Sequence, residues 1–466
     1  MHTPFSPPLL AARPLSPILP LTLAVTLAPG CLELTKELSP TDSGDDTTAT
    51  TDPDSGGDST TTGGGDTLTG ASLGDTEPGS SGAETVGETA GPDLGGAWIA
   101  TWPEVTESNY LGVGVAPNGM IFAAGWGELP NTFTRRGVLH GYTPAGEREL
   151  EYFDPSLDGW RLTDACVSGG TIYAVAEQLA TSGPHPLADD LRVLHLDGGG
   201  GLLSDAPYDG ELAPEISDVE QPPRALCDDQ GRLWVALTVT WPDNDDTTSL
   251  VLRVDDESLA WEHAIHTVGG WHDLLGFGLD PDGVVHHALD PFDGPDALTT
   301  RALWTRFAPD GSVLGQHALD EELSPGPLYG FAVGSTRAQF HGAETDAPYD
   351  TWVQAFSLDA QPLWTKPSPG DVDPTRHASI GTDGSGFIAA YAGEYPLHEL
   401  ALVQHASDGE SQGAVTVATL DEGLGALDVS DVASLGADVQ VAVGRGQLSI
   451  PEGLSAAFVA RHTLAP

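Results

Sequence analysis

The chain has 466 residues, of which 69 are acidic and 17 are Lys or Arg, so its formal charge at neutral pH is −52. A surface of this sign repels phosphate backbones, which argues against nucleic acid as a partner. Cations and basic partners are electrostatically favoured, but acidity alone selects none of them.

Residues 1–31 have the features of an export signal. Arg13 precedes an apolar stretch from Leu15 to Ala28, and small residues close it in "LAPGC", which ends at Cys31. An apolar core ending in small residues is the pattern that signal peptidases recognise. The terminal cysteine resembles that of a bacterial lipobox. This resemblance implies that Cys31 becomes the mature N-terminus and carries acyl chains that anchor the protein to a membrane. Plain secretion with an incidental cysteine is the alternative.

Residues 32–96 have a different composition. They are rich in Ser, Thr, Gly and Asp, and they include 14 acidic residues, one Lys and no aromatic residue. Such a segment has too little apolar surface to offset the entropy lost on ordering. We therefore expect a disordered acidic linker between the export signal and a folded body.

The folded body is expected over residues 97–466 and to be all-β. Apolar runs of strand length alternate with Gly, Asp and Pro, and no stretch keeps helical periodicity for more than about two turns. One phrase, "GVGVAPNGMIFAAGW" from Gly112 to Trp126, reads as strand, Asn-Gly turn and strand. Similar phrases recur roughly every 50 to 61 residues, with turns at Gly119, Gly170, Gly231, Gly283, Ser335, Gly386 and Gly436.

A second strand–turn–strand phrase follows each of the first six repeats, so a full repeat contains four strands. Seven four-stranded repeats predict a seven-bladed β-propeller. The seventh repeat stops after its third strand, "AAFVARHTLAP" at 456–466, whereas the body begins with an unpaired strand, "AWIATWPE" at 97–104. The N-terminal strand is therefore expected to complete the last blade, which removes two exposed sheet edges.

Two of the second phrases resemble pyrroloquinoline-quinone-like propeller repeats. They are "LRVDDESLAW", which ends at Trp261, and "FSLDAQPLW", which ends at Trp364. The resemblance implies the fold, with each tryptophan docked against the neighbouring blade. It does not imply the quinone cofactor, because no cofactor-clamping set is identifiable.

Cys166 and Cys227 occupy matching positions, four residues before their turn glycines, in adjacent repeats. Export permits a disulfide between them if their Cα atoms lie within about 7 Å. Two separate buried thiols are the alternative.

Metal sites have only weak candidates in the sequence. Asp243, Asp245 and Asp246 crowd one loop and could hold calcium, but a solvated acidic loop is the favoured interpretation. His263, His266 and His272 cluster near Trp271 and Asp273 without zinc-ligand spacing. His286 and His287 are adjacent on one strand and should point to opposite faces.

The leading hypothesis is an extracytoplasmic β-propeller, anchored through Cys31 at the outer membrane or cell surface, that binds or scaffolds an unknown protein or glycan ligand as a monomer. The rival is a propeller-type enzyme outside the cytoplasm, lactonase-like or a quinone-dependent oxidoreductase, with calcium at the channel. A purely structural envelope protein is a third possibility. The sequence assigns no catalytic residue.

Overall fold

The computed structural model describes fifteen stretches of the chain. They are 97–102, 105–128, 134–178, 190–208, 218–240, 247–254, 261–267, 272–291, 300–320, 327–344, 347–368, 372–392, 399–418, 424–448 and 455–463. The expected export signal, Cys31 and the linker at 32–96 lie outside these residues. The described residues belong to the compact unit Glu84–Pro466 and contain no helix that could cross a membrane.

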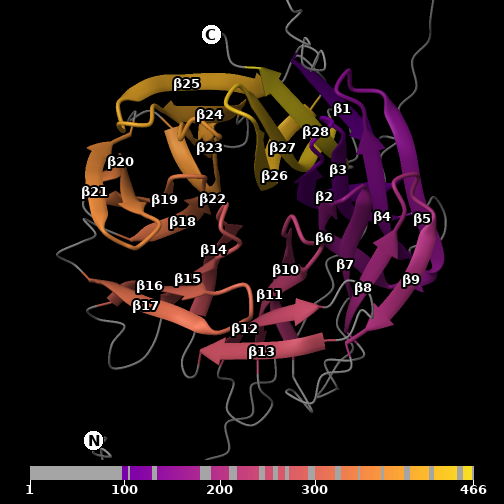
Figure 1. The fold of residues 1–466 in the computed structure, drawn as a ribbon. Helices are drawn as coiled ribbons and strands as arrows, with labels where there is room; N and C mark the ends of the chain where they lie inside the picture. The colour runs from indigo at the N-terminus through magenta and orange to yellow at the C-terminus, as the bar shows by residue number, and fades with distance from the viewer. Residues whose placement is uncertain are drawn as a thin grey trace, which may run out of the picture. The chain divides into compact units, whose positions relative to one another are not determined.

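Twenty-eight strands form seven antiparallel sheets of four strands each (Figure 1). The first sheet is β2 (Glu107–Val115), β3 (Ile121–Glu128), β4 (Arg135–Tyr142) and β5 (Arg148–Asp158). The second is β6 (Trp160–Ser168), β7 (Thr171–Gln178), β8 (Leu191–Leu196) and β9 (Leu202–Pro207). The third is β10 (Asp218–Cys227), β11 (Leu233–Thr240), β12 (Thr247–Val254) and β13 (Trp261–Thr267).

The remaining four sheets follow the same order. The fourth is β14 (His272–Leu279), β15 (Val285–Pro291), β16 (Thr300–Phe307) and β17 (Val313–Asp320). The fifth is β18 (Leu328–Val333), β19 (Arg337–Glu344), β20 (Ala347–Ser357) and β21 (Pro362–Pro367). The sixth is β22 (Val372–Ile380), β23 (Gly386–Ala392), β24 (Glu399–His405) and β25 (Ser411–Ala418). The seventh is β26 (Leu424–Leu435), β27 (Val439–Leu448), β28 (Ser455–Thr463) and β1 (Trp98–Trp102).

The seven sheets are the blades of a ring. The first strand of each blade lies innermost, and each innermost strand contacts the next one around the ring, with β26 contacting β2 (Figure 1). The predicted seven-bladed β-propeller is therefore confirmed.

The recurring Asn-Gly and Asp-x-x-Gly turns explain the repeated sequence phrase. Gly119 and Gly231 have φ of 84° and 82°, a conformation that costs glycine little and other residues more. The preceding polar side chain closes each turn. Asn118 Oδ1 accepts the Met120 amide, and Asp228 Oδ1 accepts the amides of Gln230 and Arg232 at 2.9 Å. This chemistry is typical of a type I turn followed by a left-handed residue, which joins two hairpin strands.

The second strand of a blade is buried on both faces, which is why its sequence is a continuous apolar run. All eight residues of β11 are buried. Leu233 and Val235 pack with Val175 of the second blade, whereas Trp234 packs with Phe307 of the fourth. Successive side chains of a strand point to opposite faces, so alternate residues join two neighbouring blades.

The N-terminal strand closes the ring as expected. β1 pairs antiparallel with β28, with Trp98 opposite Arg461 and Thr101 opposite Phe458. Trp98 Nε1–H also donates to the carbonyl of Pro144 in the first blade at 2.9 Å. The last blade is thus completed by one end of the folded body and fastened to the first blade by the same strand.

Tryptophans of the outer strands dock on turn glycines of the next blade. A Cβ atom added to Gly146 would lie 2.8 Å from the ring of Trp98, and one added to Gly409 would lie 2.7 Å from Trp364. The absent side chain is what leaves room for the indole. Trp364 therefore packs against the neighbouring blade as the repeat resemblance implies, whereas the side chain of Trp261 lies outside the described residues.

Candidate functional site

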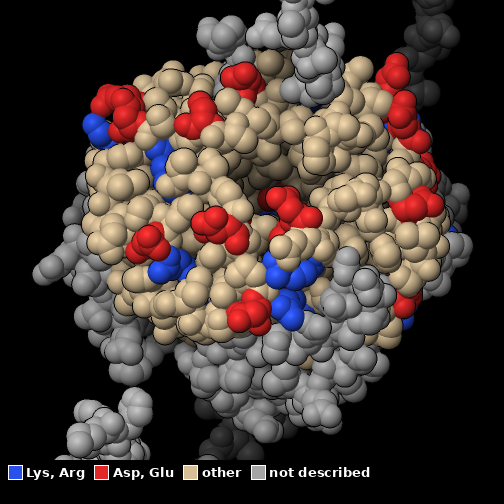
Figure 2. All heavy atoms as spheres, in the orientation of Figure 1, with Lys and Arg blue, Asp and Glu red and all other residues tan. Residues whose placement is uncertain are grey.

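A cavity of about 620 Å³ lies on the axis of the ring. Every blade lines it with its innermost strand, because the repeats place their first strands around one axis. One residue from each is Val113 of β2, Asp164 of β6, Arg224 of β10, Leu274 of β14, Phe331 of β18, Arg376 of β22 and Asp431 of β26. Figure 2 shows the surface hollowed near the middle of the ring, with acidic side chains beside the hollow.

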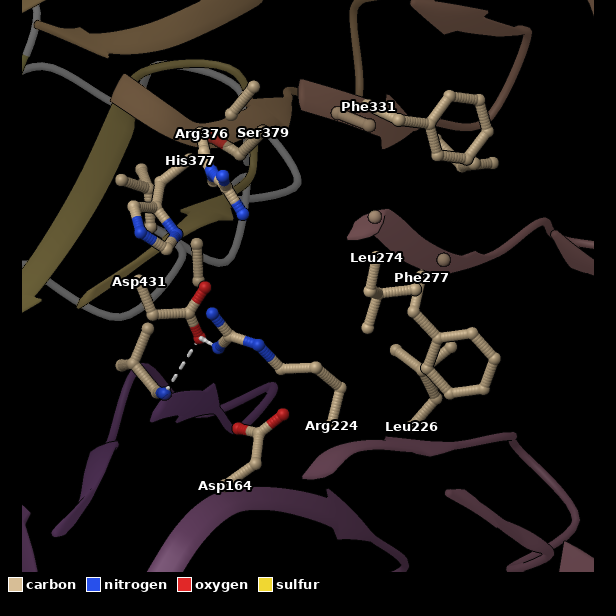
Figure 3. A pocket seen from close by; sticks show the side chains of 18 of the residues that line it. Asp164, Arg224, Leu226, Leu274, Phe277, Phe331, Arg376, His377, Ser379 and Asp431 are labelled. Atoms are coloured by element: carbon tan, nitrogen blue, oxygen red, sulfur yellow. Dashed lines mark hydrogen bonds and ion pairs between the residues drawn. The ribbon is translucent and has the colours of Figure 1, made fainter. Parts of the chain in front are cut away.

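Arg224 crosses the cavity from the third blade. Its Nη1 lies 3.0 Å from Asp431 Oδ2 of the seventh blade, and its Nη2 donates to the carbonyl of Ser430 at 2.9 Å. Nη1 also donates to the carbonyl of Leu111 in the first blade at 3.3 Å. Figure 3 shows the side chain extended from β10 toward Asp431. One planar guanidinium thus joins three blades, a geometry that lysine cannot reproduce.

The two carboxyl groups flanking Arg224 are held by backbone amides. Asp164 is 5% exposed, and its oxygens accept the amides of Ala165 and Ala225, both at 2.8 Å. Asp431 Oδ2 accepts the amide of Val113 at 3.0 Å. Burial and, as a smaller cause, the negative charge of Asp431 raise the pKa of Asp164 to about 7, although Arg224 and the amides act to lower it. Burial also raises the pKa of Asp431, against the same arginine.

A second arginine bridges two other blades beside the cavity. Arg376 Nη2 lies 2.7 Å from Asp273 Oδ2, so a residue of the sixth blade reaches the fourth across the fifth. Gln221 of the third blade donates from Nε2 to Asp273 Oδ1 at 2.8 Å and accepts the amide of Leu274 at 2.7 Å. His377, beside Arg376, has its pKa lowered well below the ordinary value by burial and then by Arg224. Both arginines therefore have carboxylate partners, and the histidine stays neutral.

We expect the Arg224 bridge to contribute strongly to stability. Arg224→Met should lower the free energy of unfolding by about 2–4 kcal/mol, because Asp431 would remain largely buried without its counter-charge. Arg445→Met is the matched control, because Arg445 pairs with Asp428 on the surface, where both side chains are about half exposed. It should cost less than about 1 kcal/mol. Equal losses in the two variants, measured by urea unfolding, would contradict the bridge.

The structure joins Cys166 of β6 to Cys227 of β10 by a disulfide, with the Cα atoms 5.6 Å apart. The two strands are innermost neighbours, so the bond staples the second blade to the third beside the cavity. Its formation in the purified protein remains a prediction. The separation of 61 residues gives a loop whose opening should cost about 2–4 kcal/mol of stability. Non-reducing mass spectrometry should show two fewer hydrogens than the reduced chain, and Cys166→Ser with Cys227→Ser should lower Tm. Free thiols in the protein purified without reductant would contradict it.

Among the described residues, the other sequence candidates do not form one site. Asp243, Asp245, Asp246 and Trp271 lie outside the described residues, as do the side chains of His263 and His266. His272 is buried on β14, and its neighbour Asp273 pairs with Arg376, which lines the cavity. The adjacent histidines have different partners: His286 Nε2 lies 3.2 Å from Asp280, and His287 Nε2 lies 2.9 Å from Ser249.

The calcium ion that the rival enzyme needs has no matching donor set in the described ranges. Across them, no three His, Cys, Asp or Glu side chains are grouped to hold a metal ion. Asp431 of the cavity and Asp273 beside it already face arginines, which leaves Asp164 as the one carboxylate of the three without an arginine partner. Calcium takes about six to eight oxygen ligands and would have to displace both arginines to gain more than one carboxylate, so the cavity does not fit the ion.

The polar residues of the cavity were not identified from the sequence. Asp164, Arg224, Arg376 and Asp431 lie on four innermost strands and are distant in the chain. Each is a charged residue within a first strand of otherwise mostly small, polar or apolar residues. A charged residue at such a position of a predicted propeller is the signal that could have found them.

No family model matches this chain, and no curated protein matches it. Similar solved structures include the propeller of Dos1, at 10% identity and a TM-score of 0.43, covering 80% of this chain and 96% of that one. The β-propeller domain of the Trilobed protease from Pyrococcus furiosus matches at 11% and 0.45, covering 77% and 98%. The polysaccharide lyase Uly1 matches at 11% and 0.45, covering 82% and 94%. Likenesses of this size concern the fold alone.

Proposed function

We propose that this protein is an exported, lipid-anchored β-propeller that acts as a binding or scaffolding module at the cell surface and takes its ligand in the axial cavity. The observation that carries the binding role is the cavity itself: about 620 Å³, lined by all seven innermost strands, with arginines and aspartates facing apolar side chains. Binding sites for small ligands are commonly concave, mostly apolar and fitted with a few placed polar groups.

The cellular part of the proposal is supported by the sequence of residues 1–31 and by the acidic linker. Its test is the partition of the protein into a detergent phase. The wild-type chain expressed in a bacterium should enter that phase, and Cys31→Ser should stay in the aqueous phase. A wild-type chain that stays in the aqueous phase would refute the lipid anchor and favour the alternative, plain secretion.

The binding role is tested by hydrogen exchange on the purified protein. Ligands would be selected from glycan and peptide arrays, and exchange would be compared with and without each ligand. The proposal predicts slower exchange on β10, β14, β22 and β26, with the outer strands β9 and β17 unchanged as an internal control. Protection confined to outer strands would place the site elsewhere on the ring.

Metal analysis separates this proposal from the rival enzyme. The module should contain no stoichiometric calcium after purification without chelator. One tightly held calcium per chain would favour the lactonase-like or quinone-dependent enzyme instead.

A further inference from the structure

The charges of the cavity do not cancel. Four charged side chains line it, namely Asp164, Arg224, Arg376 and Asp431, and Asp273 joins them through Arg376. Arg224 pairs with Asp431 at 3.0 Å, and Arg376 pairs with Asp273 at 2.7 Å. The two pairs use both arginines, so Asp164 is left over and the set carries one surplus negative charge when all five are ionised.

Asp164 has hydrogen bonds but no ion pair within 4 Å among the described residues. Each of its oxygens accepts one backbone amide, which leaves further acceptor capacity on both atoms. The carboxyl group is 5% exposed and faces the cavity below Arg224 (Figure 3). A buried carboxylate without a counter-charge is costly, and a cation placed beside it would recover part of that cost.

The side of the cavity opposite Asp431 is apolar. Leu226 of β10 and Leu274 and Phe277 of β14 line it, across from the arginine and the acids (Figure 3). A ligand that fits both sides has a charged end and an apolar body. An anion would meet two arginines already neutralised by aspartates, and it would add to the surplus negative charge.

We propose that the cavity binds an organic monocation, a protonated amine attached to an apolar chain or ring, with the ammonium group on Asp164 and the apolar part against Leu274 and Phe277. This inference rests on the proposed binding function and names the ligand class of the same cavity. The acidic surface beside the hollow and the charge of −52 would steer such a cation toward the site.

The probes are three molecules of nearly equal size: 2-phenylethylammonium, neutral 2-phenylethanol and anionic phenylacetate. Titration calorimetry on the purified protein at pH 8 should show binding of the ammonium probe. The alcohol should bind at least tenfold more weakly, and phenylacetate should not bind. Equal affinity for ammonium and alcohol, tighter binding of phenylacetate, or no heat from any probe would overturn the inference.

The dependence on pH tests the role of Asp164 without a variant. The ammonium probe stays protonated from pH 6 to pH 8, whereas Asp164 loses its proton across this range because its pKa is near 7. Affinity should therefore rise about tenfold from pH 6 to pH 8. The charged groups that act on Asp164 are Asp431, whose own pKa burial also raises, and Arg224; His377, on the far side of Asp431, is neutral throughout because burial strongly lowers its pKa. Affinity that is independent of pH would contradict the assignment.

Two variants should shift the affinity in opposite directions. Asp164→Asn should weaken the ammonium probe at least tenfold and leave the alcohol unchanged. Arg376→Gln, at an exposed residue, leaves Asp273 without its ion-pair partner and should tighten the binding of the ammonium probe severalfold. Arg445→Gln removes the same charge from β27 outside the cavity and should change nothing. If both arginine variants behave alike, the effect is one of net charge and the inference fails.

These outcomes separate the inference from the proposed function. Binding of all three probes, with exchange slowed on the innermost strands, would keep the cavity as a binding site and reject the cation. Array ligands that protect only outer strands would reject the cavity itself.

Discussion

A chain lacking residues 97–102 is expected to lose its cooperatively folded body. The deletion removes β1, so β28 keeps an unpaired edge and the seventh blade loses its link to the first blade through Trp98. It also exposes apolar neighbours of Trp102, which is 4% exposed. The cost should exceed about 5 kcal/mol, which approaches the whole stability of a typical domain. The truncated chain should either aggregate on purification or show no sharp transition when its thermal unfolding is followed by circular dichroism.

A point variant in β1 should produce a smaller loss of stability by the same cause. Trp98→Ala should cost about 2–3 kcal/mol, somewhat less than a fully buried tryptophan, because the side chain is only partly buried. Leu203→Ala is the control, because Leu203 lies on the outer strand β9 and is 57% exposed. It should change stability by less than about 0.5 kcal/mol. A truncated chain that unfolds as sharply and at the same Tm as the full chain would contradict closure by β1.

The second large effect expected is acid destabilisation between pH 6.5 and pH 4. His140, His287 and His341 are almost fully buried, and burial lowers their pKa values to about 3, about 3 and about 4. The unfolded chain binds protons on these residues near pH 6.5, and the folded chain does not. Stability is therefore fully present above pH 6.5 and falls as pH decreases. At pH 5 each histidine costs about 2 kcal/mol, or on the order of 6 kcal/mol together.

Two groups, Asp164 and Asp431, act in the opposite direction because burial raises their pKa values, and the histidines outnumber them. The pKa of Asp164 is raised to about 7, so its contribution weakens the fold as pH rises from about 4 to 7. Urea unfolding at several pH values measures the sum. His287→Asn keeps a polar group near Ser249. In this variant the slope of the unfolding free energy against pH, between pH 6.5 and pH 4, should be smaller by about one bound proton. An unfolding free energy that does not change between pH 7 and pH 5 would refute this account.

The ring and its closure were predictable because they depend on local, repeated chemistry. Gly119 and Gly231 mark hairpin turns that need a positive φ, and the apolar run of β11 marks a strand buried on two faces. The closing strand was predictable because the last repeat lacks a strand that the first residues of the body supply, with Thr101 opposite Phe458.

The cavity was not predictable because it depends on distances across the ring. Arg224 meets Asp431 only because seven strands converge on one axis, and no spacing in the chain encodes that contact. The sequence likewise left the pairing of Cys166 with Cys227 open, since two strands of neighbouring blades can approach without bringing their sulfurs together. Asp273 was noted as part of a histidine cluster, whereas the structure places it against Arg376.

Amide hydrogen exchange of β1 tests the closed ring, on which the cavity and its ligand depend, most directly. In the purified full chain, the backbone amides of Trp98–Trp102 that pair with β28 should exchange as slowly as those of β28 itself. If those amides exchange as fast as an unstructured peptide while β28 stays protected, the ring is open and the account is wrong.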